Sequence, residues 1–203
     1  YALIGLLFIG FLMINIATGK KPLPIILKIF TGLLIIGFLF HTAGFILRWY
    51  ISGYAPLSNG YESMIFVSRV TILAGFLFSG RSKLTLAATS ILASLTLMVA
   101  HMSFMDPEIT NLVPVLKSYW LTLHVSIITA SYGFLGMGAI LGLLVMILYS
   151  ILNNRNFPRI IDTIKNLTTI NYKTLTLGLY LLTIGTFLGA IWANESWGRY
   201  WGW

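Results

Sequence analysis

Long apolar runs constrain this sequence more than any other feature. A typical soluble domain has about 25% charged residues, whereas here 9% are charged and 58% are hydrophobic. Because ~20 apolar helical residues cross the hydrocarbon core of a bilayer, the sequence predicts an all-α membrane protein. We expect one domain over residues 1–203, a bundle of about six transmembrane helices. The apolar runs fall at about 2–17, 25–46, 62–79, 84–103, 119–150 and 174–193.

Basic residues fall mainly in the connections on one side of this predicted bundle. The first, third and fifth connections and their borders hold nine of the 13 Lys and Arg residues. Short Lys/Arg-rich loops stay cytoplasmic, so we expect the N-terminus and the even-numbered connections to face outward. Without interleaved aromatic residues, these loops favour the lipid bilayer as partner and no nucleic acid. The nine residues are Lys20, Lys21, Lys28, Arg81, Lys83, Arg155, Arg159, Lys165 and Lys173.

Glycine pairs at a spacing of four occur in the last two apolar runs, as Gly138/Gly142 and Gly185/Gly189. Small residues let helix backbones approach closely in a membrane, so we expect these two helices to pack inside the bundle. The fifth run is about 48 Å long as a helix, against ~30 Å of hydrocarbon. It should therefore tilt strongly or project beyond the membrane.

All three histidines, His41, His101 and His124, fall near outward ends of predicted helices. A single histidine at a membrane boundary is often only an interfacial hydrogen-bonding residue. Three at one depth also suit a ligand or proton site. The sequence contains no cysteine, which excludes a disulfide, a Cys-ligated metal and a thiol nucleophile.

Aromatic residues crowd the segment WANESWGRYWGW, residues 192–203. One interpretation is an interfacial aromatic belt, and the other is a flat platform for a large planar ligand. Arg48, Arg69 and Arg199 form an outward set of cations able to hold carboxylates. For Arg69 the alternative is an ion pair with Glu62, seven residues earlier on the same helical face.

The outward connection before the third run reads PLSNGYES, residues 56–63. Ser58 or Asn59 is the expected N-cap of the helix that follows.

Three segments resemble known sequence motifs. The segment 192–203 resembles the WWD signature of the haem-handling proteins of cytochrome c maturation. PLSNGYES and residues 105–133, MDPEITNLVPVLKSYWLTLHVSIITASYG, are similar to the outer-loop and following-helix pattern of the CcsA/ResC branch. The WWD element alone is moderately specific, and all three in this order are highly specific.

The resemblance implies a haem site. In that family two outward histidines flank the Trp-rich segment and ligate the haem iron. His124 matches the position of the first ligand, whereas the second would follow Trp203, so the chain looks truncated at its C-terminus. His41 and His101 do not match either position and stay unassigned. The implied haem contacts are His124, Trp192, Trp197, Gly198, Arg199, Tyr200, Trp201 and Trp203.

The implied function is that of a haem c synthase, a lyase-type enzyme. It would attach haem b, with ferrous iron, through thioether bonds to a CxxCH apocytochrome c. The implied partner is CcsB/ResB, as a separate subunit or fused N-terminally. The implied location is the bacterial inner membrane, with the site on its outer face, or the thylakoid membrane in a plastid. The alternatives are a haem exporter or haem-delivery chaperone without synthase activity, a transporter of another solute, and a structural subunit.

Overall fold

The computed structural model describes residues 1–102, 104–111, 118–152 and 158–200. In these ranges the chain forms six helices and no strand, which confirms the prediction of an all-α membrane protein. Five of the described helices are long and apolar enough to cross a membrane, and α1, with 17 residues, is shorter. The helices are α1 (Ala2–Thr18), α2 (Pro24–Ser52), α3 (Gly60–Phe78), α4 (Lys83–Ala100), α5 (Tyr119–Leu152) and α6 (Pro158–Trp197).

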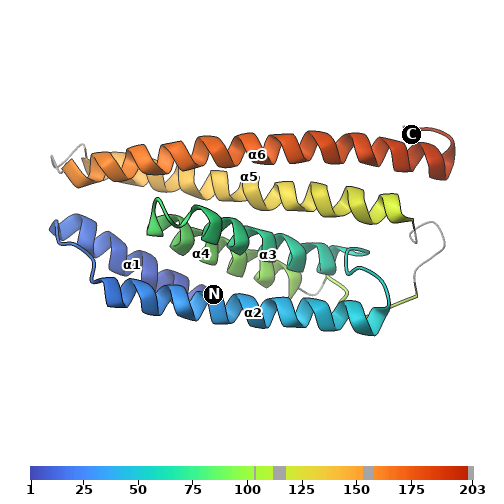
Figure 1. Ribbon diagram of the computed structural model, residues 1–203, viewed down its shortest axis with the longest axis horizontal. Coiled ribbons are helices and arrows are strands. Elements are labelled where there is room, and N and C mark those ends of the chain that lie inside the picture. Colours follow the sequence, from blue (N-terminus) through green and yellow to red (C-terminus); the bar gives the residue numbers. More distant parts are fainter. Residues whose placement is uncertain (103, 112–117, 153–157, 201–203) are drawn as a thin grey trace.

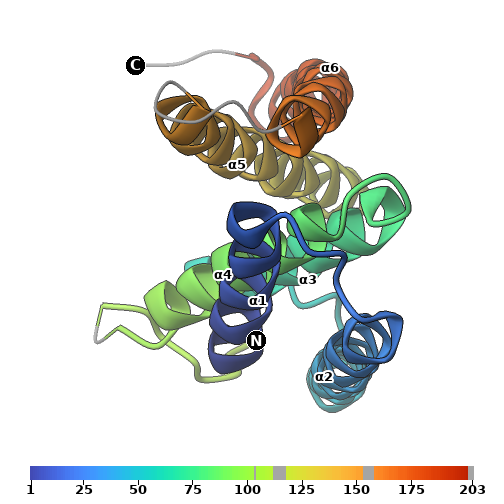
Figure 2. The same ribbon diagram turned by 90° about the vertical axis from the view of Figure 1, so that its left-hand side faces the viewer.

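The helices run roughly along one axis, and each reverses the direction of the one before (Figure 1). The α5–α6 pair lies on one side, α3 and α4 pack against α5, α1 packs on α4, and α2 lies at the periphery (Figure 2). The connections after α1, α3 and α5 gather at one end, called here the basic end, which carries Lys20, Lys21 and Arg81. The other end, called the aromatic end, carries Trp120 and Trp197.

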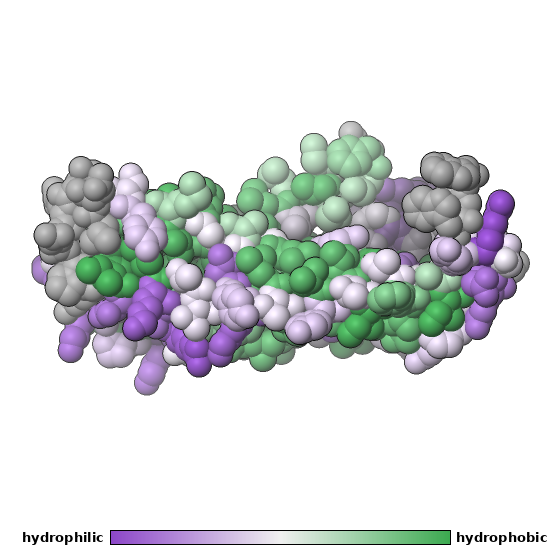
Figure 3. All heavy atoms as spheres, turned by 90° about the horizontal axis from the view of Figure 1, so that it is seen from above, coloured by the Kyte–Doolittle hydropathy of each residue, from purple (hydrophilic) through white to green (hydrophobic). Residues whose placement is uncertain are grey.

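The surface between the two ends is apolar. Hydrophilic residues gather toward the ends of the face formed by α6, above all at the basic end (Figure 3). Large apolar side chains of α2, such as Ile36, Phe40 and Leu47, are exposed, whereas small residues of α4, such as Ala87 and Ala88, are buried. Small residues at helix contacts and large apolar residues facing outward are the pattern of a bundle surrounded by lipid.

The predicted start of the last helix, at residue 174, was wrong. Helix α6 begins at Pro158 and has 40 residues, or about 60 Å. Proline suits the first turn of a helix because its missing N–H has no partner there. The basic stretch is helical because Ile160, Ile164 and Leu167 recur at helical spacing and are buried.

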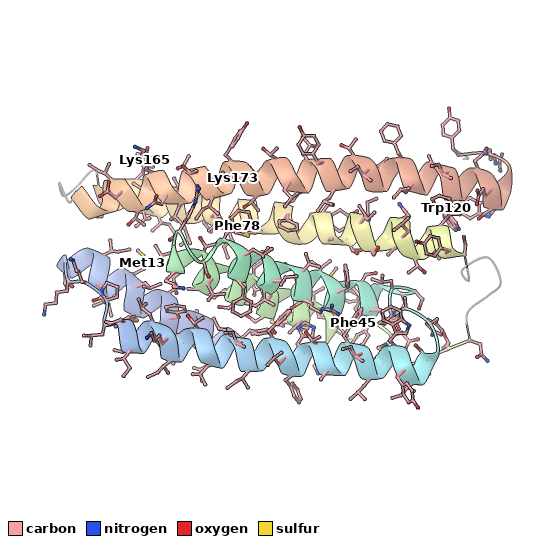
Figure 4. The ribbon with its side chains drawn as sticks, in the orientation of Figure 1. Met13, Phe45, Phe78, Trp120, Lys165 and Lys173 are labelled. Carbon is pink, nitrogen blue, oxygen red and sulfur yellow. The ribbon has the colours of Figure 1, made fainter. Side chains whose placement is uncertain are left out.

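The α5–α6 pair extends past α3 and α4 at the basic end, as expected for a helix too long for the bilayer (Figure 1). Lys165 lies in this extension, and Lys173 lies level with Phe78 near the end of α3 (Figure 4). Arg155 lies outside the described residues. The apolar part of α6 therefore begins near the level at which α3 ends.

The two glycine-rich helices pack closely on each other, as expected, but α6 packs mainly on α5 and lies at the edge of the bundle, not inside it (Figure 2). A methyl group on Gly138 of α5 would lie 2.8 Å from Cγ of Leu175 in α6. A methyl group on Gly185 of α6 would lie 2.9 Å from Cγ1 of Ile128 in α5. These separations are too short for a real contact, so the glycines let the two backbones approach.

Helix α2 continues beyond its predicted end at residue 46 and reaches Ser52. Arg48, Trp49 and Tyr50 therefore lie in the last turns of the helix and not in the connection that follows it. Gly53 ends the helix with φ of 73°, in the left-handed region that glycine adopts without steric cost. This extension places Arg48 beside the start of α3.

Candidate functional site

Arg48 and Glu62 form an ion pair that joins α2 to α3 at the aromatic end. Nε of Arg48 donates to Oε1 of Glu62 at 2.8 Å, and Glu62 is only 1% exposed. The second oxygen of Glu62 accepts from the backbone N–H and the hydroxyl of Ser58, at 2.8 and 2.7 Å. This buried carboxylate is therefore both charge-paired and hydrogen-bonded, as burial of a charge requires.

The predicted ion pair between Glu62 and Arg69 was wrong. Glu62 lies in the first turn of α3 and faces the end of α2, whereas Arg69 lies deeper in the helix. The guanidinium of Arg69 lies over the ring of Phe45, 4.6 Å from its centroid, a cation–π arrangement. Asn59 is confirmed as the N-cap of α3, since its Oδ1 accepts from the N–H of Glu62 at 2.9 Å.

Arg48 also holds the connection between α4 and α5. Its Nη1 donates to the carbonyl of Pro107 at 2.8 Å and its Nη2 to that of Glu108 at 3.4 Å. The Tyr54 hydroxyl donates to the Thr110 carbonyl at 2.8 Å. The two outer segments named in the resemblance, 56–63 and the start of 105–133, are thus fastened together. Arg48 already binds these acceptors and is therefore not free to bind the carboxylates of a ligand.

His124 lies at the contact between α5 and α6, near the aromatic end. Its Nδ1 is 2.6 Å from the carbonyl oxygen of Gly185. A carbonyl only accepts, so Nδ1 carries the hydrogen, and Nε2 of the neutral ring keeps its lone pair. Histidines that ligate metals usually donate their other N–H to a carbonyl or carboxylate in this way. The Gly185 carbonyl therefore fixes the orientation of the His124 ring against α6.

Gly189 makes room for the imidazole of His124. A methyl group at residue 189 would lie 2.7 Å from Nδ1 and 2.9 Å from Nε2. The second glycine of the α6 pair therefore accommodates the histidine and not only the neighbouring backbone. The imidazole packs on α6 and does not point toward the surrounding lipid. Trp192 follows Gly189 by three residues, about one helical turn.

Trp192 and Trp197 pack edge to face, with ring centroids 4.9 Å apart and an interplanar angle of 65°. Trp197 is 61% exposed. Nε1 of Trp192 is buried and has no hydrogen-bond partner among the described residues. A buried indole N–H usually has an acceptor, so this enclosed and unpaired donor is unusual.

The helix ends directly after this pair of indoles. Gly198 has φ of 69°, and its N–H donates to the carbonyl of Asn194 at 2.8 Å. Arg199 and Tyr200 follow and are exposed. The two remaining residues of the expected haem contacts, Trp201 and Trp203, lie outside the described residues. The structure thus brings His124 onto α6 near Trp192, and pairs Trp192 with Trp197.

Sequence reasoning missed a second feature of the aromatic end, called here the histidine pocket. It is a cavity of about 650 Å³ between α2, α3 and α4. Both unassigned histidines line it, one from α2 and one from α4. The sequence predicted that both histidines lie at the same depth. It did not predict that their two helices border one cavity. The lining includes His41, Gly44, Phe45, Tyr61, Leu97 and His101.

Comparison with known proteins identifies the family. Residues 57–203 match the family described as Cytochrome C assembly protein. The chain is 54% identical over 166 residues to Protein NrfI of Wolinella succinogenes, covering 82% of this chain and 18% of that protein.

Two relatives are cytochrome c biogenesis proteins CcsA. That of Chlamydomonas reinhardtii is 35% identical over 98% of this chain and 56% of its own length. That of Prochlorococcus marinus (strain MIT 9301) is 30% identical over 100% of this chain and 74% of its own length. The chain thus spans about half of the first of these and less than a fifth of NrfI. It belongs to the cytochrome c assembly protein family, in the CcsA/ResC branch that its motifs resemble.

Proposed function

We propose that this chain is the haem-binding part of a cytochrome c synthase. It binds haem b at the aromatic end and presents it to an apocytochrome c with a CxxCH motif. The observation that carries this proposal is the hydrogen bond from His124 Nδ1 to the Gly185 carbonyl. This bond leaves the Nε2 lone pair for iron and fixes the orientation of the ring. Gly189 supports the same role because it leaves space for the imidazole.

Trp192 and Trp197 are the proposed support for the porphyrin ring. Their edge-to-face packing gives a rigid apolar surface, and the unpaired Nε1 of Trp192 offers a hydrogen bond. Gly198 and Tyr200 continue this surface, and Trp201 and Trp203 complete the proposed contact set. Arg199 is the proposed cation for a haem propionate, since it is exposed next to the indoles.

The proposed reaction joins two substrates that carry the reactive groups themselves. Each cysteine S–H of the apocytochrome adds across a haem vinyl C=C, forming one C–S and one C–H bond without net electron transfer. The haem iron is ferrous in this reaction. The residues of this chain bind and orient the porphyrin, which places its vinyl groups near the thiols.

We propose that the chain acts with a CcsB/ResB partner, as a separate subunit or as the N-terminal part of one polypeptide. The aromatic end is proposed to face the periplasm, or the thylakoid lumen in a plastid. The accumulation of Lys and Arg at the basic end supports this orientation.

Replacement of His124 tests the proposal. In the complete complex, His124→Ala should lose most of the co-purified haem and most cytochrome c formation. Pyridine haemochrome absorbance measures the first, and haem staining of the cytochrome after gel electrophoresis the second. His101→Ala, which removes a histidine at the same end, should retain the haem. Normal haem content and an unchanged axial-ligand spectrum in His124→Ala would remove His124 from the site.

The second candidate function is a haem exporter or haem-delivery chaperone without synthase activity. It is favoured by the residues of the site, because the described ones are mainly binding groups and only His124 and Tyr200 among them can exchange protons. The two functions differ in their product. When the haem-loaded complex is mixed with reduced apocytochrome, a synthase yields haem that resists acid–acetone extraction. A chaperone yields haem that remains extractable.

A further inference from the structure

The histidine pocket lies away from His124, which is on α5, because α2, α3 and α4 form its walls. Its volume of about 650 Å³ is within the range of small-molecule sites. Most of the wall is apolar, including Phe45, Leu97 and Ile65. Phe40 and Met98 line the pocket and are 80% and 61% exposed. The pocket therefore borders the lipid-facing surface, and a ligand dissolved in the membrane has access to it.

His41 gives the pocket an unsatisfied polar group. Its Nδ1 lies 3.5 Å from the Tyr1 hydroxyl, and the backbone of Ile65 also interacts with the ring. Its Nε2 is buried and makes no well-formed hydrogen bond among the described residues. An unpaired polar atom in a membrane-spanning helix is costly. An acyl chain in the pocket would leave this nitrogen unpaired. Because Nε2 is enclosed, a ligand oxygen would pair with it once the imidazole turns toward the pocket.

The charges in the pocket wall balance. Arg48 and Glu62 both line the pocket and neutralise each other at 2.8 Å. The guanidinium of Arg48 is further occupied by the carbonyls of Pro107 and Glu108. The guanidinium of Arg69 lies over the ring of Phe45, and Arg69 is not part of the wall. Among the lining residues no cation is left unpaired for the two carboxylates of a haem, and Arg69 acts on His41 by its charge from behind the wall. A neutral ligand that presents an oxygen to His41 suits this arrangement.

Three helices each contribute a side chain able to donate and accept hydrogen bonds: His41 from α2, Tyr61 from α3 and His101 from α4. A quinone carries carbonyl oxygens on opposite edges of an apolar ring, and a quinol carries hydroxyls there. We propose that the histidine pocket binds the ring of a membrane quinone or quinol. A quinone is neutral, which suits the mostly apolar wall. It dissolves in the bilayer, from which the pocket is reached. Its oxygens can pair with the polar side chains that the three helices contribute.

Filling the pocket tests this proposal. Gly44 lines the pocket, and a methyl group built there meets nothing within 4 Å, so a larger side chain can begin there without a backbone clash. Gly32 on the same helix has equal space and does not line the pocket, so Gly32→Leu is a matched control. The probe is 2,3-dimethyl-1,4-naphthoquinone, titrated calorimetrically into the complete complex in nanodiscs. Gly44→Leu should weaken binding by about tenfold or more, and Gly32→Leu should bind as the wild type.

Replacement of His41 tests the hydrogen bond separately. His41→Phe should weaken naphthoquinone binding by about tenfold, and His41→Gln, which keeps polar atoms, should weaken it less. His124→Ala should leave this affinity unchanged, so failure of the haem proposal does not affect this result. Absence of saturable binding, or equal binding by wild type and Gly44→Leu, would overturn the proposal. Displacement of the probe by haem through this pocket would assign the pocket to haem instead.

Discussion

The His124 imidazole lies where a side chain at residue 189 of α6 would otherwise be. Gly189 leaves the space in which the ring lies, and the Gly185 carbonyl fixes the hydrogen on Nδ1. The role of His124 was implied by resemblance, but its orientation was not. Neither the tautomer nor the contact with Gly189 follows from the sequence, because both depend on the rotation of α5 against α6.

Gly189→Ala should therefore disturb the haem without removing a ligand. The added methyl group would lie 2.7 Å from Nδ1 of His124, so the ring must shift. We expect a changed axial-ligand spectrum and at least a partial loss of bound haem, measured by absorbance and resonance Raman spectroscopy. Gly142→Ala in α5 is the control, since its methyl group would make an ordinary 3.5 Å contact with Nδ2 of Asn171. A wild-type spectrum in Gly189→Ala would argue against His124 as the iron ligand.

At the scale of helices, the apolar runs predicted where the chain crosses the membrane but not where the helices end. The polar first half of α6 was interpreted as a loop because it has no continuous apolar run. Its buried residues, Ile160, Ile164 and Leu167, are separated by basic and polar ones. The predicted end of α2 came too early because the apolar run stops before Arg48, whereas the helix continues to Ser52. The histidine pocket was missed because the approach of α2 to α4 is a long-range contact without a local signal.

The ion pair between α2 and α3 leads to a prediction at this scale. Glu62→Gln would leave the guanidinium of Arg48, whose side chain is 16% exposed, without its charge partner. Breaking a buried pair costs about 3 kcal/mol or more, so the thermal unfolding temperature in detergent should fall by several degrees. Glu195→Gln, at an exposed position on α6, should leave it nearly unchanged. An equal unfolding temperature in both variants would show that the pair contributes little to stability.

At the scale of the whole molecule, the two ends differ in chemistry. One gathers lysine and arginine, and the other gathers tryptophan, histidine and the two fastened connections. The number of Lys and Arg residues in each connection was enough to assign it to an end, because consecutive helices place successive connections at opposite ends. The helix neighbours, and hence the two separate histidine environments, required the three-dimensional arrangement.

Cysteine labelling tests the proposed orientation, because residues 1–203 contain no cysteine and any cysteine elsewhere in the protein can be replaced first. Asn111→Cys lies at the aromatic end and Gly80→Cys at the basic end, and both positions are exposed. In intact bacterial cells whose outer membrane has been opened, a membrane-impermeant maleimide should label Asn111→Cys only. Gly80→Cys should react once the inner membrane is permeabilised. The reverse order of labelling would invert the proposed sidedness.

The single guanidinium that joins Glu62, Pro107 and Glu108 has a consequence for dynamics. Segments fastened by one shared group open as one cooperative unit. Amide protons on both outer connections should therefore exchange with solvent deuterium in the same opening event, although about 50 positions separate them in the chain. Loss of Arg48 should make this shared opening more frequent, with the Tyr54–Thr110 and Asn59–Asp106 hydrogen bonds left to hold the two connections.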